Sequence, residues 1–206
     1  MTTVKVCGIT NPEDARVAAE AGADMVGFIF YPPSPRYVTP EQVRRMVEML
    51  PPDLVTVGVF VNETVETVTR VVATSGIQMV QLHGEEGPEL CQALPCRVIK
   101  AFRFTPQVRP EMMRDYAVEA FLIEGFHADF YGGVGAQADW HQVAALQPYG
   151  RMILAGGLTP ENVQEAIRIA RPYGVDVGSG VETAPGKKDW HKVRTFVRRA
   201  KAWTEA

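Results

Sequence analysis

Short apolar stretches rich in β-branched residues recur along the chain at intervals of about 20 to 30 residues. Each stretch precedes a longer segment in which apolar positions follow helical spacing, and this alternation is typical of strand and helix units in a parallel sheet. The stretches are almost continuously apolar, as expected of strands that are covered on both faces. The pattern predicts eight strands, at Val4–Cys7, Met25–Phe30, Leu54–Phe60, Met79–Leu82, Arg97–Ala101, Ala120–Ile123, Arg151–Ala155 and Val175–Val177.

Three of the intervening segments begin with residues that favour a helix N-terminus. Thr10 or Asn11 can cap the first helix, with Pro12 at its first position and two acidic residues in its first turn, where acids suit the helix dipole. The tripeptides Thr39-Pro40-Glu41 and Thr159-Pro160-Glu161 repeat this order of cap, proline and acid. We therefore expect a helix to begin directly after each of these caps.

Eight strand and helix units in 206 residues are near the lower limit for a closed (β/α)8 barrel, the TIM-barrel architecture. Little length is left for a second domain, and no Ser/Gly-rich linker or charge run divides the chain. The predicted fold is therefore α/β, a single (β/α)8 barrel over residues 1–206. A doubly wound open sheet is the main alternative because the same local signals build it, but the count of eight favours closure.

The composition, with 46% hydrophobic and 22% charged residues, is that of an ordinary globular protein. The 21 basic and 24 acidic residues give a formal net charge of -3, which excludes a strongly basic nucleic-acid-binding protein and gives no sign of a membrane-binding surface. The chain contains neither a transmembrane-length apolar run nor a secretory signal, so we expect a cytoplasmic protein.

The number and spacing of the cysteines and histidines fit neither a disulfide framework nor a metal site. The cysteines number three, and none forms a Cys-x-x-Cys pair. The four histidines fall in separate segments without the spacing of a zinc site. We therefore expect free thiols and no bound metal.

The ends of the predicted strands carry candidate catalytic groups, because a barrel places its working residues at the C-terminal ends of its strands. Cys7 ends the first strand and could act as a base, although a lone cysteine also fits a small buried hydrophobe. Lys5 could assist the Cys7 thiolate if the two side chains were close. Glu124 directly follows the run Phe121-Leu122-Ile123 and is a candidate acid, since charged groups are rarely buried without a partner or a function.

Other polar residues lie near the same mouth of the barrel. Arg36, in the proline-stiffened loop after the second strand, could bind a carboxylate with two parallel hydrogen bonds, or it could equally be a solvated surface residue. Asn62, Gln81, His83 and Asp176 stand at the ends of the third, fourth and eighth strands. Taken singly, Asn62, Gln81 and His83 are each more often structural polar groups than catalysts.

Two glycine-rich turns follow the seventh and eighth strands. Gly156 and Gly157 lie in the first turn, and Ser179 and Gly180 lie in the second. Their backbone N–H groups would lie side by side at the place where barrels commonly bind phosphate. Tight loop geometry is the alternative interpretation, but both turns occur at the expected strands.

Six motifs occur in order over essentially the whole chain. They are Lys5-Val6-Cys7-Gly8-Ile9-Thr10, Gly58-Val59-Phe60-Val61-Asn62, Gln81-Leu82-His83-Gly84, Gly132-Gly133-Val134-Gly135 with Asp139-Trp140, Ala155-Gly156-Gly157-Leu158, and Asp176 through Glu182 followed by Pro185-Gly186-Lys187-Lys188-Asp189. Each motif alone is weak, whereas six in register are specific. Together they make the chain resemble the phosphoribosylanthranilate isomerases of tryptophan biosynthesis.

The resemblance implies a (β/α)8 barrel that converts N-(5-phosphoribosyl)anthranilate to 1-(2-carboxyphenylamino)-1-deoxyribulose 5-phosphate by an Amadori rearrangement, with no cofactor. It implies that Cys7 is the general base and that Glu124 takes the place of the family's general acid. It further implies that Arg36 holds the anthranilate carboxylate and that the turns after the seventh and eighth strands hold the phosphate.

Two residues depart from the family's pattern. Glu124 stands where the family usually has aspartate, so the site must absorb one added methylene, and Asp129 in the following loop is a rival for the role of the acid. Gly178 stands where a serine is common in the turn after the eighth strand. This change removes a hydroxyl but keeps a backbone N–H.

Two other functions fit parts of the pattern. Another phosphosugar aminoaldose-ketose isomerase, such as that of histidine biosynthesis, fits the phosphate turns, although a cysteine on the first strand argues against it. A non-catalytic barrel that binds a phosphorylated metabolite or a partner protein fits the unusual Glu124 but leaves Cys7 without a use. In the leading interpretation the partner is a small phosphorylated substrate, with no nucleic acid or membrane, and the protein is a monomer or a homodimer.

Overall fold

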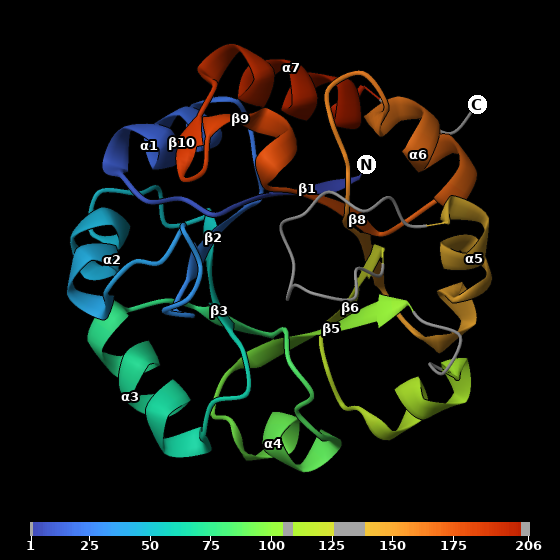
Figure 1. Ribbon diagram of the computed structural model, residues 1–206, viewed down its shortest axis with the longest axis horizontal. Helices are drawn as coiled ribbons and strands as arrows, with labels where there is room; N and C mark the ends of the chain where they lie inside the picture. The colour runs from blue at the N-terminus through green and yellow to red at the C-terminus, as the bar shows by residue number, and fades with distance from the viewer. Residues whose placement is uncertain (1, 105–108, 126–138, 203–206) are drawn as a thin grey trace.

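The computed structural model describes residues 2–104, 109–125 and 139–202. Its centre is a closed barrel of parallel strands in chain order, which β1 closes by pairing with both β2 and β8 (Figure 1). The predicted (β/α)8 barrel is thereby confirmed, and the open sheet is excluded. The strands are β1 (Thr3–Cys7), β2 (Met25–Ile29), β3 (Val55–Phe60), β4 (Met79–Leu82), β5 (Arg97–Phe104), β6 (Ala120–Gly125), β7 (Met152–Leu154) and β8 (Gly174–Val177).

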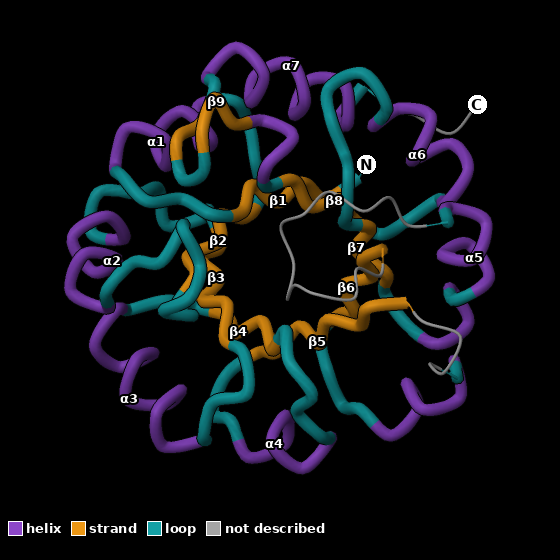
Figure 2. The backbone as a smooth tube through the Cα atoms, viewed as in Figure 1, coloured by secondary structure: helices purple, strands orange, loops and turns teal. Residues whose placement is uncertain are grey.

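Helices surround the barrel as an outer ring (Figure 2). The α-helices are α1 (Pro12–Glu20), α2 (Pro40–Val47), α3 (Val65–Ser75), α4 (Pro88–Ala93), α5 (Trp140–Ala145), α6 (Val163–Ala170) and α7 (Trp190–Lys201). Short 3-10 helices η1 (Pro110–Asp115), η2 (Gln147–Tyr149) and η3 (Ser179–Val181) complete the connections. A small hairpin of β9 (Glu182–Ala184) and β10 (Lys187–Lys188) follows η3 and lies beside α1.

Two of the three predicted helix starts are correct. Asn11 caps α1 through its side chain, and Thr39 forms a capping box at the start of α2. The third prediction is wrong, because α6 begins only at Val163. The Asn162 side chain instead closes a turn, accepting the Thr159 N–H at 2.8 Å and donating to the Gly157 carbonyl at 2.9 Å. This turn anchors the loop that follows β7.

Strand β6 is longer than the sequence predicts. Arg103 on β5 pairs in register with Glu124, and the next pair reaches Gly125. Glu124 therefore stands inside a paired strand. A backbone held by strand pairing gives the carboxyl group a fixed starting position at the mouth of the barrel.

The barrel interior is filled by alternate residues of the strands, which form a buried cluster separate from the layer between strands and helices. This cluster contains Met25, Val57, Met79, Ile99, Ala101, Ala120, Leu122, Ile153 and Ala155. Because side chains alternate along a strand, Gln81 follows Met79 and Glu124 follows Leu122 on the inward face. The alternation that builds the core therefore also aims the polar groups into the mouth.

Candidate active site

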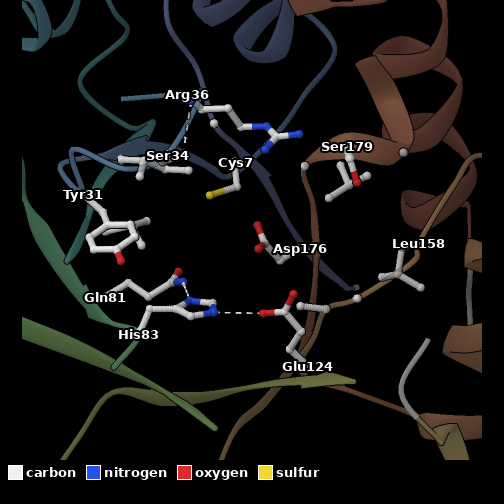
Figure 3. Close-up of a pocket in the computed structure, with 18 of the residues that line it drawn as sticks. Cys7, Tyr31, Ser34, Arg36, Gln81, His83, Glu124, Leu158, Asp176 and Ser179 are labelled. Carbon is white, nitrogen blue, oxygen red and sulfur yellow. Dashed lines mark hydrogen bonds and ion pairs between the residues drawn. The ribbon is translucent and has the colours of Figure 1, made fainter. Parts of the chain in front are cut away.

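One cavity opens at the C-terminal ends of the barrel strands (Figure 3). Of the residues predicted for the site, those that line it are Cys7, Arg36, Gln81, His83, Glu124, Gly156, Gly157, Asp176, Ser179 and Gly180. They come from segments that are far apart in the sequence. Tyr31 and Ser34, in the loop that carries Arg36, also line the cavity and were not predicted.

Cys7 lies next to a buried ion pair. The Lys5 ammonium is 3.0 Å from Asp176 Oδ1, and the Lys5 side chain is only 1% exposed. Gly27 on β2 leaves the space where these groups meet, because a Cβ there would lie 2.7 Å from Cys7 Sγ and 3.1 Å from Lys5 Nζ. Lys5 thus lies beneath the cavity and does not line it.

The charges around Cys7 act on its pKa in opposite directions. Burial raises the pKa of the Cys7 thiol, and this effect exceeds the lowering by the Lys5 charge. Burial also lowers the pKa of Lys5, but Asp176 and Cys7 together raise it to about 12. Lys5 therefore stays cationic at neutral pH, while Cys7 is mostly a thiol.

Glu124 is held by a chain of side chains from β4. Its Oε2 is 2.8 Å from His83 Nε2, and His83 Nδ1 is 2.8 Å from Gln81 Nε2. With the Gln81 amide oriented so that its Nε2 donates, Nδ1 accepts, and in this tautomer of His83 Nε2 carries the hydrogen that faces the carboxyl group. In Figure 3, Asp176 is drawn between Cys7 and this chain of side chains.

The two glycine turns pack directly against each other. Gly156 and Gly157 adopt positive φ values of 85° and 64°, which other residues rarely tolerate. A Cβ on Gly180 would lie 1.9 Å from the Leu158 carbonyl oxygen. The close contact places the start of η3, at Ser179, beside the turn after β7, and this arrangement suits an anion.

Gly180→Ala is therefore expected to push the two turns apart and to weaken binding of inorganic phosphate by about tenfold or more, as measured by calorimetry. Gly87→Ala is the matched control, because a Cβ there would meet only the end of the flexible Glu89 side chain, which can move aside. Equal phosphate affinity in Gly180→Ala and the wild type would show that these turns do not form the anion site.

Arg36 points into the cavity but is paired with an acid. Its Nε donates to Glu182 Oε1 at 2.9 Å and its Nη2 donates to Glu182 Oε2 at 2.7 Å. The Ser34 hydroxyl accepts the Arg36 backbone N–H at 3.2 Å. The interpretation of Arg36 as a solvated surface residue is wrong, since its side chain is only 11% exposed.

Asn62 lies at the mouth but outside the cavity lining. It has a left-handed backbone with φ of 54°, and its Oδ1 accepts the Glu85 N–H at 2.7 Å. Its role in the structure is to shape the loop after β4. Asp129 and the motif Gly132-Gly133-Val134-Gly135 lie outside the described residues, whereas Asp139 caps α5.

Within the described part of the chain, no group of three or more His, Cys, Asp or Glu side chains could hold a metal ion. Over the same residues, no helix has the length and apolar character needed to cross a membrane. All three cysteines are free thiols.

Comparison with known proteins gives the same family from sequence and from structure. The family model of N-(5'-phosphoribosyl)anthranilate (PRA) isomerase matches residues 4–199. An N-(5'-phosphoribosyl)anthranilate isomerase from Geobacter sulfurreducens is 50% identical over 203 residues, covering 98% of this chain and all of the relative. The solved isomerase from Thermus thermophilus has a TM-score of 0.90 at 41% identity, covering 98% of this chain and 99% of the other.

A third relative was solved with a ligand. This phosphoribosyl anthranilate isomerase, in complex with reduced 1-(o-carboxyphenylamino)-1-deoxyribulose 5-phosphate, has a TM-score of 0.85 and is 41% identical. The alignment covers 98% of this chain and all of that one. The similarity therefore includes the strand ends and turns that form the cavity.

Proposed function

The chain belongs to the N-(5'-phosphoribosyl)anthranilate isomerase family, and from this premise we propose which of its residues carry out the reaction. The enzyme converts N-(5'-phosphoribosyl)anthranilate to 1-(2-carboxyphenylamino)-1-deoxyribulose 5-phosphate in tryptophan biosynthesis. The observation that supports the assignment is a single cavity that holds a thiol, a carboxyl group, a guanidinium and two glycine turns. These are the groups needed for a base, an acid, a carboxylate site and a phosphate site.

Glu124 is the general acid that opens the sugar ring. The nitrogen lone pair of the glycosylamine forms a C1=N bond while the bond from C1 to the ring oxygen breaks, and that oxygen takes the proton from Glu124. In the tautomer of His83 that donates from Nε2, Oε2 of Glu124 accepts at 2.8 Å, so the proton for the substrate is carried on Oε1. The hydrogen bonds from Gln81 through His83 to Glu124 thus set which carboxyl oxygen faces His83 and which one carries the proton.

Cys7 is the general base of the second step. The minor fraction of Cys7 that is thiolate removes the proton from the sugar C2, the electron pair forms the C1–C2 double bond, and the C1=N electrons return to nitrogen. The resulting enolamine then tautomerises to the ketone. Lys5, which is cationic and next to Cys7, stabilises the thiolate during this step.

The ends of the substrate are held at opposite sides of these groups. The backbone N–H groups of the turns after β7 and β8 bind the phosphate, including those of Gly156, Gly157, Ser179 and Gly180. Arg36 binds the anthranilate carboxylate. Binding at both ends sets the sugar C1 and C2 between Glu124 and Cys7, which raises the rate by orientation.

The protonation state of Cys7 can be measured by alkylation with iodoacetamide, because only the thiolate reacts. Burial raises the pKa of Cys7, so the alkylation rate is expected to climb with pH from 7 to beyond 9. Mass spectrometry of peptides separates Cys7 from Cys91 and Cys96. A rate that is already at its plateau at pH 7 would show a low-pKa thiolate, contrary to this account.

We also propose a cytoplasmic location, since three free thiols fit a reducing compartment, and a single domain over residues 1–206. The oligomeric state we propose is a monomer or a homodimer. A relative from Thermotoga maritima is described as dimeric, with monomers generated from it. Sedimentation of the purified protein distinguishes the two states.

A further inference from the structure

Arg36 rests on a second layer of charged residues that the reaction itself does not use. Glu182, the first residue of β9, binds the Nε and Nη2 edge of the guanidinium. Lys188, on β10, donates from Nζ to Glu182 Oε1 at 2.9 Å. The three side chains therefore form one chain, from a buried ammonium through a carboxylate to the arginine in the cavity.

Lys188 also binds two backbone carbonyls of the active site. Its ammonium donates to the Cys7 carbonyl at 2.6 Å and to the Gly178 carbonyl at 3.0 Å, and its side chain is fully buried. One side chain thus joins the strand end that carries the base, the turn that follows β8, and the partner of Arg36. The backbone of Lys188 is fixed in turn, because its N–H donates to Asp14 at 2.9 Å.

The charges in this chain keep Glu182 ionised. Burial raises the pKa of Glu182, but the hydrogen bonds from Arg36 and the charge of Lys188 outweigh it, and the pKa is lowered overall. Burial lowers the pKa of Lys188 against the opposing effect of Glu182. An anionic Glu182 is the form that can accept both N–H groups of Arg36.

The pairing limits how Arg36 can turn. Glu182 occupies one edge of the planar guanidinium, which leaves the edge that includes Nη1 for a ligand in the cavity. Gly8 supports the same placement, because a Cβ there would lie 2.7 Å from Arg36 Cδ. A long side chain that is already ordered loses less conformational entropy when it binds a ligand.

We propose that Glu182, held by Lys188, is a positioning residue that orients Arg36 toward the ortho carboxylate of the substrate and so sets the preference for carboxylated arylamines. This inference rests on the proposed role of Arg36. A purely structural role, in which Glu182 only closes the hairpin of β9 and β10, would affect all substrates of the enzyme alike.

The test compares two substrates, N-(5'-phosphoribosyl)anthranilate and N-(5'-phosphoribosyl)aniline, which lacks the carboxylate. In Glu182→Gln one of the two acceptor oxygens becomes an NH2 group, which would face an N–H of Arg36 or the Lys188 ammonium, so the two-point pairing with Arg36 is lost. We expect kcat/KM for the anthranilate compound to fall about tenfold, mainly through KM, while kcat/KM for the aniline compound changes less than about threefold. The ratio of the two values does not depend on how much of the protein is folded.

Two further variants serve as controls for this comparison. Glu182→Asp keeps the carboxylate and should recover part of the preference. Glu20→Gln removes an exposed acid that is also paired with an arginine, Arg16, far from the cavity, and it should leave both substrates unchanged. Equal losses on both substrates in Glu182→Gln would overturn the proposal.

Arg36→Ala separates this inference from the assignment on which it rests. We expect Arg36→Ala to abolish the preference for the carboxylated substrate, and Glu182→Gln in that background to change the ratio no further. If Arg36→Ala kept the preference, the assigned role of Arg36 would be wrong. If Arg36→Ala lost it while Glu182→Gln kept it, only the role of Glu182 would be wrong.

Discussion

Cys7→Ala is expected to lower kcat by at least about 100-fold, because a positioned general base typically contributes that much or more. The loss corresponds to about 2.7 kcal/mol of transition-state stabilisation. Substrate should still bind, since the phosphate turns and Arg36 do not depend on the thiol side chain. Steady-state kinetics and calorimetry with inorganic phosphate check the two halves of this expectation.

Cys91→Ala is the matched control, because Cys91 is a buried thiol on α4 that does not line the cavity. Its kcat per folded molecule should equal that of the wild type. Near-normal turnover in Cys7→Ala would remove Cys7 from the mechanism and leave the base unassigned.

Glu124→Gln should abolish most of the activity, by at least about 100-fold in kcat, since an amide of the same shape cannot donate a proton of suitable acidity. Glu124→Asp should keep substantial activity, because aspartate is the usual residue of the family at this place. The expected order of kcat is therefore wild type, then aspartate, then glutamine. His83 contacts the carboxyl group at 2.8 Å, so a shorter acid loses some of this support.

Asp129 is the residue that could contradict this choice of acid. A Glu124→Gln enzyme with nearly unchanged kcat, together with an inactive Asp129→Asn variant, would show that Asp129 donates the proton. We favour Glu124 because strand pairing with Arg103 holds its backbone, and catalytic groups on rigid elements are better preorganised than those on loops.

The fold could be predicted because its signals are local and repeated. Each strand is a short apolar run followed by a helical segment. Eight such units match the number in a closed (β/α)8 barrel. The start of α6 could not be predicted in the same way. Thr159-Pro160-Glu161 has the composition of a helix start, but the Asn162 side chain completes a turn first.

Candidate site residues could be predicted where a residue type suited to the chemistry stands at the end of a strand. Cys7 and Glu124 stand at strand ends, so alternation along the strand aims them inward. Asn62 differs, because the alternation in β3 and just beyond it aims Val59 and Val61 into the cavity, and the left-handed backbone of Asn62 turns its side chain to Glu85. The prediction of Asn62 as a site residue took account of its residue type and not of this alternation.

The partner of Arg36 illustrates the main limit of the sequence. Glu182 is 146 positions from Arg36 in the chain, and no periodicity links the two. Lys188 looks like an ordinary member of a basic pair in the sequence, yet it is among the most buried charged residues. Such pairs are fixed by closure of the barrel, which brings β8 and the following hairpin back to β1.

An assay of the purified chain with N-(5'-phosphoribosyl)anthranilate, run beside the corresponding aminoaldose of histidine biosynthesis, decides whether this cavity performs the reaction assigned to it. We expect conversion of the first compound to 1-(2-carboxyphenylamino)-1-deoxyribulose 5-phosphate, with kcat/KM at least about 100-fold above that for the second, because in the proposed mechanism Arg36 recognises the carboxylate and Cys7 acts as the base. A preference for the histidine intermediate, or phosphate binding without isomerisation of either compound at any pH, would contradict this account.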